Sequence, residues 1–403
     1  MGTGISCITS GESHGPAEVC IIEGVPAGLR LAAEGIDLQL HRRQTGYGRG
    51  GRMAIESDHV EILSGVRGGS TLGTPVTLLV KNADHRNWIP AMQAAPWATG
   101  EGGSGPSVTV PRPGHADYAG LCKHDHHDIR NVLERASARE TVSRVAGGAV
   151  ARALLRELGV EVRGRVIAVG GVEDATVVDL NDPQSINWAA VEASALRVAD
   201  AGAELAIIAQ IDAAREAGES LGGTLEVWAW GLVPGLGGYA TRQMRLDGRL
   251  LGSVGSVPAI VGVELGLGFK RAGLRGSAAQ DAFYVSGTER PVVQRRSNRA
   301  GGVEGGMTNG SPLVLRAAMK PIPTMTSPLP SVDLQDMTAA PAHKERSDIV
   351  AVPAATVVAE AEVCLVLASA YVEKFGGDCL GDLQEALRLY CARLEARGLW
   401  RRS

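Results

Sequence analysis

The chain has 403 residues, of which 44% are hydrophobic, and its formal net charge is −4. The apolar content suffices for a large core, and the lack of a general basic excess argues against a nucleic acid or membrane partner. Six scattered cysteines without a C-x-x-C pair disfavour a zinc or redox site and are typical of a cytoplasmic protein. We also expect no signal peptide and no membrane span, because neither pattern is evident.

The first predicted elements are two strands, residues 5–9 and 18–23, joined by a loop at residues 11–16. The loop has the sequence G-E-S-H-G-P, so His14 lies on a connection between strands, where functional groups concentrate. The alternative is an ordinary surface histidine.

A helix predicted over residues 36–43 continues into R-R-Q-T-G-Y-G-R-G-G-R at residues 42–52. The glycines satisfy G-x-G-x-x-G, but a dinucleotide site needs a strand before this motif and a helix after it. Four arginines in a glycine-rich loop favour binding of phosphate or carboxylate by guanidinium groups. A solvated basic loop is the alternative.

Two further strands are predicted over residues 60–66 and 75–81. A long segment rich in Ala, Gly, Pro and Ser follows at residues 82–110. Loops of this length in a compact domain are usually functional or disordered, so we interpret it as a flap.

The densest group of acids, bases and cations lies at residues 112–140 and predicts a site for an anion. A Pro-Gly turn precedes His115. A helix would place His124, His127 and Asp128 on one face, but no further Cys, His or Glu completes a metal site. We therefore predict no bound metal.

Ser137 and Glu140 form a capping-box pattern before a helix with apolar residues at three- and four-residue spacing. Gly147 and Gly148 inside this helix each cost roughly 1 kcal/mol relative to alanine. Such small residues predict a close-packed neighbour and a place in the core. The start of this helix, beside Arg135, would suit a phosphate.

The rest of the chain alternates predicted strands and helices, which indicates a mixed α/β architecture in one large domain over residues 1–403. The predicted strands are residues 160–172, 224–233, 261–265 and 312–319, and the predicted helices are residues 203–216, 249–257 and 354–375. A glycine-rich loop at 301–310 and Lys320 suggest a further anion contact, although no Walker motif is present.

Six of these segments together resemble the chorismate synthase family. They are G-E-S-H-G-P at 11–16, R-R-Q-T-G-Y-G-R-G at 42–50, R-P-G-H-A-D at 112–117, R-A-S-A-R-E-T at 135–141, G-G-M-T-N-G at 305–310 and R-S-D at 346–348. They follow the family's order and span most of the chain, so the set is specific where one segment is not. The resemblance implies an α+β fold, a β-α-β sandwich with helices between sheets, and a homotetramer.

The resemblance also implies a reaction, the anti-1,4-elimination of phosphate from 5-enolpyruvylshikimate 3-phosphate to give chorismate. This is the last common step of the shikimate pathway to aromatic amino acids. The family requires reduced FMN without net redox change, so we expect FMN as cofactor, NADPH as a possible reductant and an external flavin reductase as partner. Two alternatives stay open: a paralogue acting on a related phosphorylated enolpyruvyl substrate, and a non-catalytic regulator that binds a phosphorylated ligand.

Individual roles follow from the same resemblance. His14 would be the general acid at the leaving phosphate, His115 would protonate the reduced flavin near N1, and Asp348 would assist proton removal at flavin N5. Arg43 and Arg49 would bind the substrate or NADP. The residues expected to bind FMN are Arg135, Ala136, Ser137, Pro258, Ala259, Gly305, Lys320, Pro321, Ile322, Pro323, Thr324 and Arg346.

Two of these positions depart from the family's pattern. Pro258 stands where the family usually has Asn or Gln, and Pro323 stands where it usually has Ser or Ala. Each proline lacks a backbone N–H that could reach a ligand. We therefore expect these positions to affect FMN affinity more than the reaction.

Overall fold

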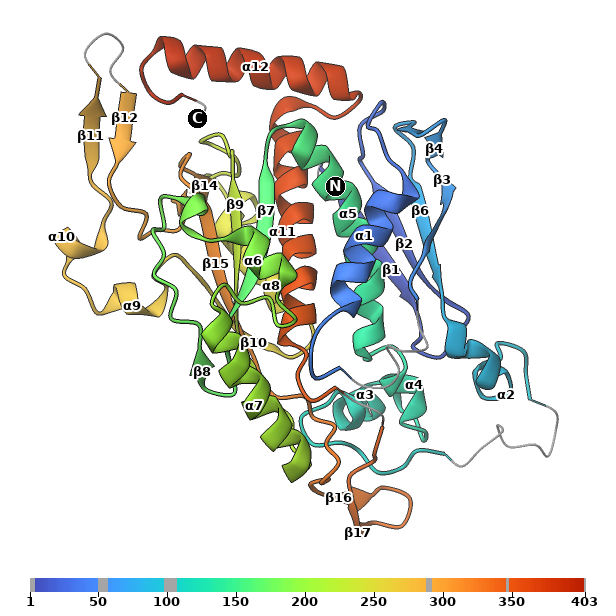
Figure 1. Ribbon diagram of the computed structural model, residues 1–403. Helices are drawn as coiled ribbons and strands as arrows, with labels where there is room; N and C mark the ends of the chain where they lie inside the picture. Colours follow the sequence, from blue (N-terminus) through green and yellow to red (C-terminus); the bar gives the residue numbers. More distant parts are fainter. Residues whose placement is uncertain (1–3, 50–56, 98–106, 288–291, 346–347, 402–403) are drawn as a thin grey trace.

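A layer of helices lies between two antiparallel sheets in the computed structural model, which describes residues 4–49, 57–97, 107–287, 292–345 and 348–401 (Figure 1). The first sheet has the order β1 (Ser6–Gly11), β2 (Ala17–Glu23), β6 (Val76–Lys81), β3 (Val60–Ser64). The second has the order β10 (Ile260–Leu265), β15 (Leu313–Met319), β9 (Gly223–Trp230), β7 (Glu161–Val169), β8 (Val172–Glu173). The predicted α+β fold with helices between sheets is confirmed.

Three helices form most of the middle layer: α1 (Ala33–Gln44), α5 (Thr141–Glu157) and α11 (Val352–Phe375). Helix α5 packs on the first sheet, while α11 packs on β7 and β9 of the second (Figure 1). One hydrophobic cluster of buried side chains includes residues from both sheets and from all three helices.

The glycine pair of α5 explains how closely the layers approach. A Cβ atom at Gly148 would lie 2.3 Å from the Cβ of Ala361 on α11. A Cβ atom at Gly147 would lie 2.9 Å from the Sγ of Cys7 on β1. The close-packed neighbour predicted from these glycines is therefore confirmed on both sides of the helix.

A buried ion cluster also crosses the layer. Glu360 of α11 is fully buried, and its carboxylate accepts hydrogen bonds from Arg42 Nη1 (2.7 Å) and Arg152 Nη2 (2.5 Å). Burial would raise the pKa of Glu360, but the arginines outweigh it and lower that pKa to about 2. Arg42 is therefore part of a buried ion cluster. The prediction that Arg42 belongs to a ligand-binding loop was wrong.

One described helix bears on the expectation that the chain has no membrane span. Helix α11 is long and apolar enough to cross a membrane by length and composition. However, 89% of its apolar window is buried inside the protein, which assigns α11 as a core helix.

The remaining elements surround this centre. In the first half of the chain they are β4 (Val66–Arg67), β5 (Ser70–Thr71), η2 (Ala83–Asn87), α2 (Ile89–Met92), α3 (Asp117–His124), α4 (Arg130–Leu133), η3 (Ala138–Glu140), η4 (Pro183–Ser185) and α6 (Trp188–Ala193). Later come α7 (Ala201–Ala217), η5 (Arg242–Met244), α8 (Leu246–Gly255), α9 (Phe269–Ala272), α10 (Gly276–Ala279), β11 (Phe283–Ser286), β12 (Val292–Arg295), β13 (Val303–Glu304), β14 (Met307–Thr308), β16 (Pro330–Asp333), β17 (Thr338–Pro341) and α12 (Leu380–Ala396).

Two local predictions need correction. Helix α3 ends at His124 because Asp125 adopts a left-handed conformation (φ 53°), so His124, His127 and Asp128 do not share a helical face. The capping box is only half present: Ser137 Oγ accepts from the N–H of Arg139, but the carboxylate of Glu140 binds Arg144 instead. The part of segment 82–110 at residues 98–106 lies outside the described residues.

Candidate active site

A cavity of about 420 Å³ opens at one end of the helix layer. Its lining includes Arg43 at the end of α1, Ala138 just before α5 and Ala351 just before α11. The N-termini of α5 and α11 therefore border the cavity, and free N–H groups with a positive partial charge favour an anion there. The second sheet contributes Met319 at the end of β15.

Two arginines of the cavity share one buried carboxylate. Asp58 accepts from Arg43 Nη2 at 3.0 Å and from Arg139 Nη1 at 2.6 Å. Arg139 is also held through Nε by Asn82 Oδ1 at 2.7 Å. Burial lowers the pKa of Arg43 to about 10 although Asp58 opposes this, so the group stays charged at neutral pH. The pair presents two oriented guanidinium groups to a ligand.

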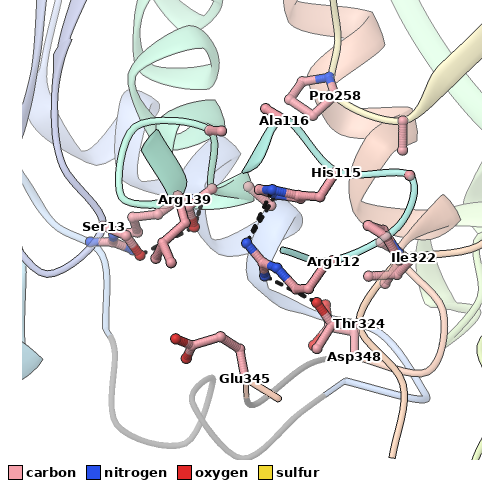
Figure 2. Close-up of a pocket in the computed structure, with 18 of the residues that line it drawn as sticks. Ser13, Arg112, His115, Ala116, Arg139, Pro258, Ile322, Thr324, Glu345 and Asp348 are labelled. Carbon is pink, nitrogen blue, oxygen red and sulfur yellow. Dashed lines mark hydrogen bonds between the residues drawn. The ribbon is translucent and has the colours of Figure 1, made fainter. Parts of the chain in front are cut away.

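A third cationic position pairs with a predicted catalytic residue. Arg49 Nη1 lies 3.0 Å from Asp348 Oδ2, and both side chains line the cavity. Figure 2 shows Asp348 and Glu345 on the side of the cavity opposite Ala116 and Pro258. Arg346, predicted to bind FMN, lies outside the described residues.

His14 is clamped by a buried glutamate. Its Nδ1 lies 3.0 Å from both carboxylate oxygens of Glu134, which also accepts from the backbone N–H of His14 at 2.9 Å. The imidazole stacks on Trp88 with ring centroids 4.1 Å apart. Arg130 Nη1 donates to the same carboxylate at 3.1 Å. Burial would raise the pKa of Glu134, but the bonds from His14 and the charge of Arg130 hold that pKa below its usual value.

His115 has a similar carboxylate partner but a different surrounding. Its Nδ1 lies 2.6 Å from Asp117 Oδ1. Arg112 binds the same carboxylate through Nε and Nη2, and its Nη2 also lies 3.0 Å from Nδ1 of His115 (Figure 2). Burial would raise the pKa of Asp117, yet the hydrogen bonds from His115 and Arg112 hold that pKa well below its usual range. Asp117 is therefore an ionised acceptor that contacts both His115 and Arg112.

An apolar wall completes the cavity. It consists of Leu133, Ala136, Pro258, Ala259, Met319, Ile322 and Pro323. Ala259 has a positive φ of 67°, which is strained for a residue with a Cβ. Lys320 borders this wall, and its Nζ donates to the carbonyl of Gly114 at 2.6 Å. The lining of the cavity thus combines apolar and cationic side chains.

Most of the residues predicted from the sequence meet at this cavity. They are His14, Arg43, Arg49, His115, Ala136, Ser137, Pro258, Ala259, Lys320, Ile322, Pro323, Thr324 and Asp348. Both prolines that depart from the family's pattern are among them.

Three predicted residues lie outside the cavity lining. Arg135 turns toward the first sheet, where it donates to the carbonyls of Thr9 and Gly11. Gly305 forms the turn between β13 and β14 with φ 58°, and Pro321 packs against Gly222. In this chain none of the three contributes to the cavity surface.

The sequence analysis gave no individual role to Ser13, Arg112, Arg139 or Glu345, all of which line the cavity. Arg112 and Arg139 belong to the segments that carry the family resemblance, and this could have marked both as candidate site residues. No pattern pointed to Glu345. Among the described residues, no group of three or more His, Cys, Asp or Glu side chains could hold a metal ion.

Two histidines on buried carboxylates, facing several guanidinium groups in one cavity, define an enzyme that binds an anionic substrate and moves protons. Comparisons with known proteins identify the family. The family model described as chorismate synthase matches residues 5–372. A chorismate synthase from Desulforudis audaxviator is 52% identical over 390 residues, which cover 96% of this chain and 98% of that protein. One from Moorella thermoacetica is 52% identical over 384 residues, covering 95% and 97%.

A solved structure gives the same result. The crystal structure of a chorismate synthase superimposes with a TM-score of 0.79 at 37% sequence identity, covering 98% of this chain and 100% of that chain. The chain therefore belongs to the chorismate synthase family and is an enzyme.

Proposed function

We propose that this enzyme is a carbon–oxygen lyase that forms chorismate, in the biosynthesis of aromatic amino acids, by anti-1,4-elimination of phosphate from 5-enolpyruvylshikimate 3-phosphate. The observation that carries the proposal is one cavity that holds both loop histidines beside Arg43, Arg112 and Arg139. The comparisons do not favour a paralogue with another substrate or a non-catalytic regulator.

The cationic side chains of the cavity suit this substrate, which carries a phosphate and two carboxylates. Arg43 and Arg139 are oriented by Asp58, and preorganised guanidinium groups bind such anions with two parallel hydrogen bonds. The N-termini of α5 and α11 add favourable partial charges. Ser13 and Ser137, whose hydroxyls are 3.1 Å apart, provide further donors in the same cavity.

Proton transfer completes the elimination, because phosphate leaves with the C–O electron pair while the ring loses a proton and gains a double bond. His14 would protonate the departing phosphate, and Asp348 would assist proton removal at flavin N5, as the family resemblance implies. His115, with Asp117 at Nδ1, would keep a proton available at the same cavity. These roles agree with the cavity positions of the three side chains.

FMN is the proposed cofactor, and the residues present fit it. The apolar wall offers a surface for a flat ring system, and Lys320 and the arginines beside it suit an anionic reduced flavin and its phosphate. Ala136, Ser137, Pro258, Ala259, Ile322, Pro323 and Thr324 would hold the cofactor. Bound reduced FMN would supply electron chemistry that side chains lack, without net redox change.

Other parts of the proposal concern the whole protein. We propose a single domain over residues 1–403, supported by the hydrophobic cluster that joins both sheets. A homotetramer, a cytoplasmic location, and supply of reduced flavin by a separate NADPH-dependent reductase complete the proposal. The buried position of α11 and the modest net charge agree with a protein that does not bind membranes or nucleic acid.

The test is an oxygen-free reaction of the purified protein with dithionite-reduced FMN and 5-enolpyruvylshikimate 3-phosphate. We expect chorismate and inorganic phosphate in equal amounts, and no product when oxidised FMN replaces the reduced form. Binding of the substrate without either product would support a regulator instead and would overturn the proposal.

A further inference from the structure

We propose that Glu134 is the positioning residue for His14. Its carboxylate keeps a proton on Nδ1 of His14, so that Nε2 is the nitrogen that donates a proton in the cavity. The same carboxylate stabilises the imidazolium form of His14. The proposal rests on the proposed function, because it assigns a partner to the acid that would protonate the departing phosphate. Glu134 does not line the cavity, so its effect on the reaction would pass through His14.

The contacts of Glu134 restrict His14 in several ways. Its carboxylate binds both Nδ1 and the backbone N–H of His14, and its carbonyl accepts from the N–H of Ser13 at 2.9 Å. Trp88 supports one face of the imidazole, and Nδ1 of His85 lies 2.9 Å from the His14 carbonyl. Because Nδ1 is occupied, Nε2 is the nitrogen that remains for a ligand; none of the described residues forms a hydrogen bond with it.

The state of the carboxylate decides which nitrogen carries the proton. The Glu134 side chain is only 2% exposed, and its pKa lies below the usual value in spite of burial, so it is an ionised acceptor at neutral pH. An ionised acceptor requires a donor at Nδ1. Neutral His14 would then carry its proton on Nδ1, and the imidazolium would carry a second proton on Nε2.

The other charged groups around His14 act in both directions. Glu345 faces the same part of the cavity and favours the imidazolium, but its side chain is 26% exposed and its Oε1 is engaged by His343 at 3.0 Å. Arg130 opposes the imidazolium, although it also binds and holds the carboxylate of Glu134. Buried and in direct contact, Glu134 is the strongest of these influences.

The second histidine provides an internal comparison. A guanidinium nitrogen of Arg112 lies 3.0 Å from Nδ1 of His115, so a positive charge on the His115 ring would be repelled by the charge of Arg112. At His14 the corresponding arginine, Arg130, instead donates to the far partner, the carboxylate of Glu134. In the part of the chain that the structure describes, His14 therefore lacks the direct contact with a guanidinium group that His115 makes with Arg112.

The proposed step balances. The C–O bond to phosphate breaks with its electron pair on the phosphate oxygen, and Nε2 of His14 gives its proton to that oxygen. The Nδ1 proton stays between His14 and Glu134, and the carboxylate stays ionised. Solvent returns a proton to Nε2 before the next turnover.

The first experiment uses the ligand-free wild-type protein with ¹⁵N-labelled histidine. NMR would identify His14 by the signals that disappear in His14→Asn. We expect the neutral ring to carry its proton on Nδ1, and a neutral ring with its proton on Nε2 would overturn the proposal. This NMR experiment requires neither FMN nor a Glu134 variant that folds.

The second experiment compares Glu134→Gln with wild type under the oxygen-free assay. Glutamine keeps the size of the side chain but removes the charge, so we expect turnover to fall about 100-fold. The alkaline limb of the kcat–pH profile should move at least about one unit lower, since an opposite charge at this distance contributes one to three units. A merely structural defect would lower the rate without moving the limb, and Glu134→Asp should restore part of the shift.

Glu140→Gln is the matched control. Glu140 is a buried carboxylate on the same segment that binds Thr9 and Arg144 but no histidine. It should leave the His14 nitrogen signals and the alkaline limb in place. An active wild type with an unmoved limb in Glu134→Gln would refute the role of Glu134 alone, whereas a wild type without turnover would refute the proposed function.

Discussion

A single methyl group at Gly148 should destabilise the whole helix layer. In Gly148→Ala the new Cβ would lie 2.3 Å from the Cβ and 2.5 Å from the Cα of Ala361. Carbon atoms in contact normally stand about 3.5–4.0 Å apart, so α5 and α11 would have to separate by roughly 1 Å or more. The obstacle is a backbone and a Cβ, which cannot rotate away as a long side chain could.

The magnitude follows from two opposing effects. Overpacking of a core typically costs about 1–3 kcal/mol and occasionally more, and the rigid contact with Ala361 favours the upper end. Replacing a helical glycine with alanine returns about 1 kcal/mol. We therefore expect Gly148→Ala to lower the free energy of unfolding by about 2 kcal/mol.

Urea denaturation followed by tryptophan fluorescence would measure this change, since Trp228 is fully buried in the second sheet. Gly35→Ala is the control, because a Cβ at this exposed position of α1 would meet nothing within 4 Å. It should leave stability unchanged or raise it by up to about 1 kcal/mol. A Gly148→Ala protein as stable as wild type would refute the close-packing argument.

Two further predictions concern buried carboxyl groups. Burial raises the pKa of Glu18 from 4.5 to about 7, so the stability that its protonated form contributes is complete below pH 4.5 and is lost as the pH rises through 7. Urea denaturation would give the free energy of unfolding of Glu18→Gln and of wild type at each pH. The value for the variant minus the value for wild type should rise by roughly 3 kcal/mol from pH 4.5 to pH 8. A difference that does not change with pH would contradict this. Asp58→Asn should raise the substrate KM by about 10-fold, or roughly 1.4 kcal/mol, because asparagine removes the negative charge and leaves one acceptor oxygen for Arg43 and Arg139. Steady-state kinetics would show this, and an unchanged KM would contradict it.

Much of the fold could be predicted from local patterns. The strand pattern before His14 and the apolar spacing of α5 agree with the structure within a few residues, because hydrophobic periodicity is a local property. The glycine pair of α5 even indicated a close neighbour. That neighbour, Ala361, could not be named, because it lies more than 200 residues along the chain.

The candidate site shows the same division. Arg112 and Asp117 lie close to His115 in sequence, so their contact with it was accessible to inspection. Glu134 meets His14 across 120 residues, and no pattern marks either as a partner of the other. Arg135 belongs to a segment expected to bind FMN, yet it turns to backbone carbonyls of β1 that its own segment does not contain.

The hydrogen bond between Arg112 and Thr324 joins groups 212 positions apart, and Arg49 meets Asp348 across an even longer stretch of chain. Loop closure over such distances is entropically costly and slows folding. During synthesis, His14 and Glu134 leave the ribosome long before Lys320 and Asp348 do. The cavity can therefore be completed only late in translation, and an incomplete chain would leave part of its apolar lining exposed to solvent.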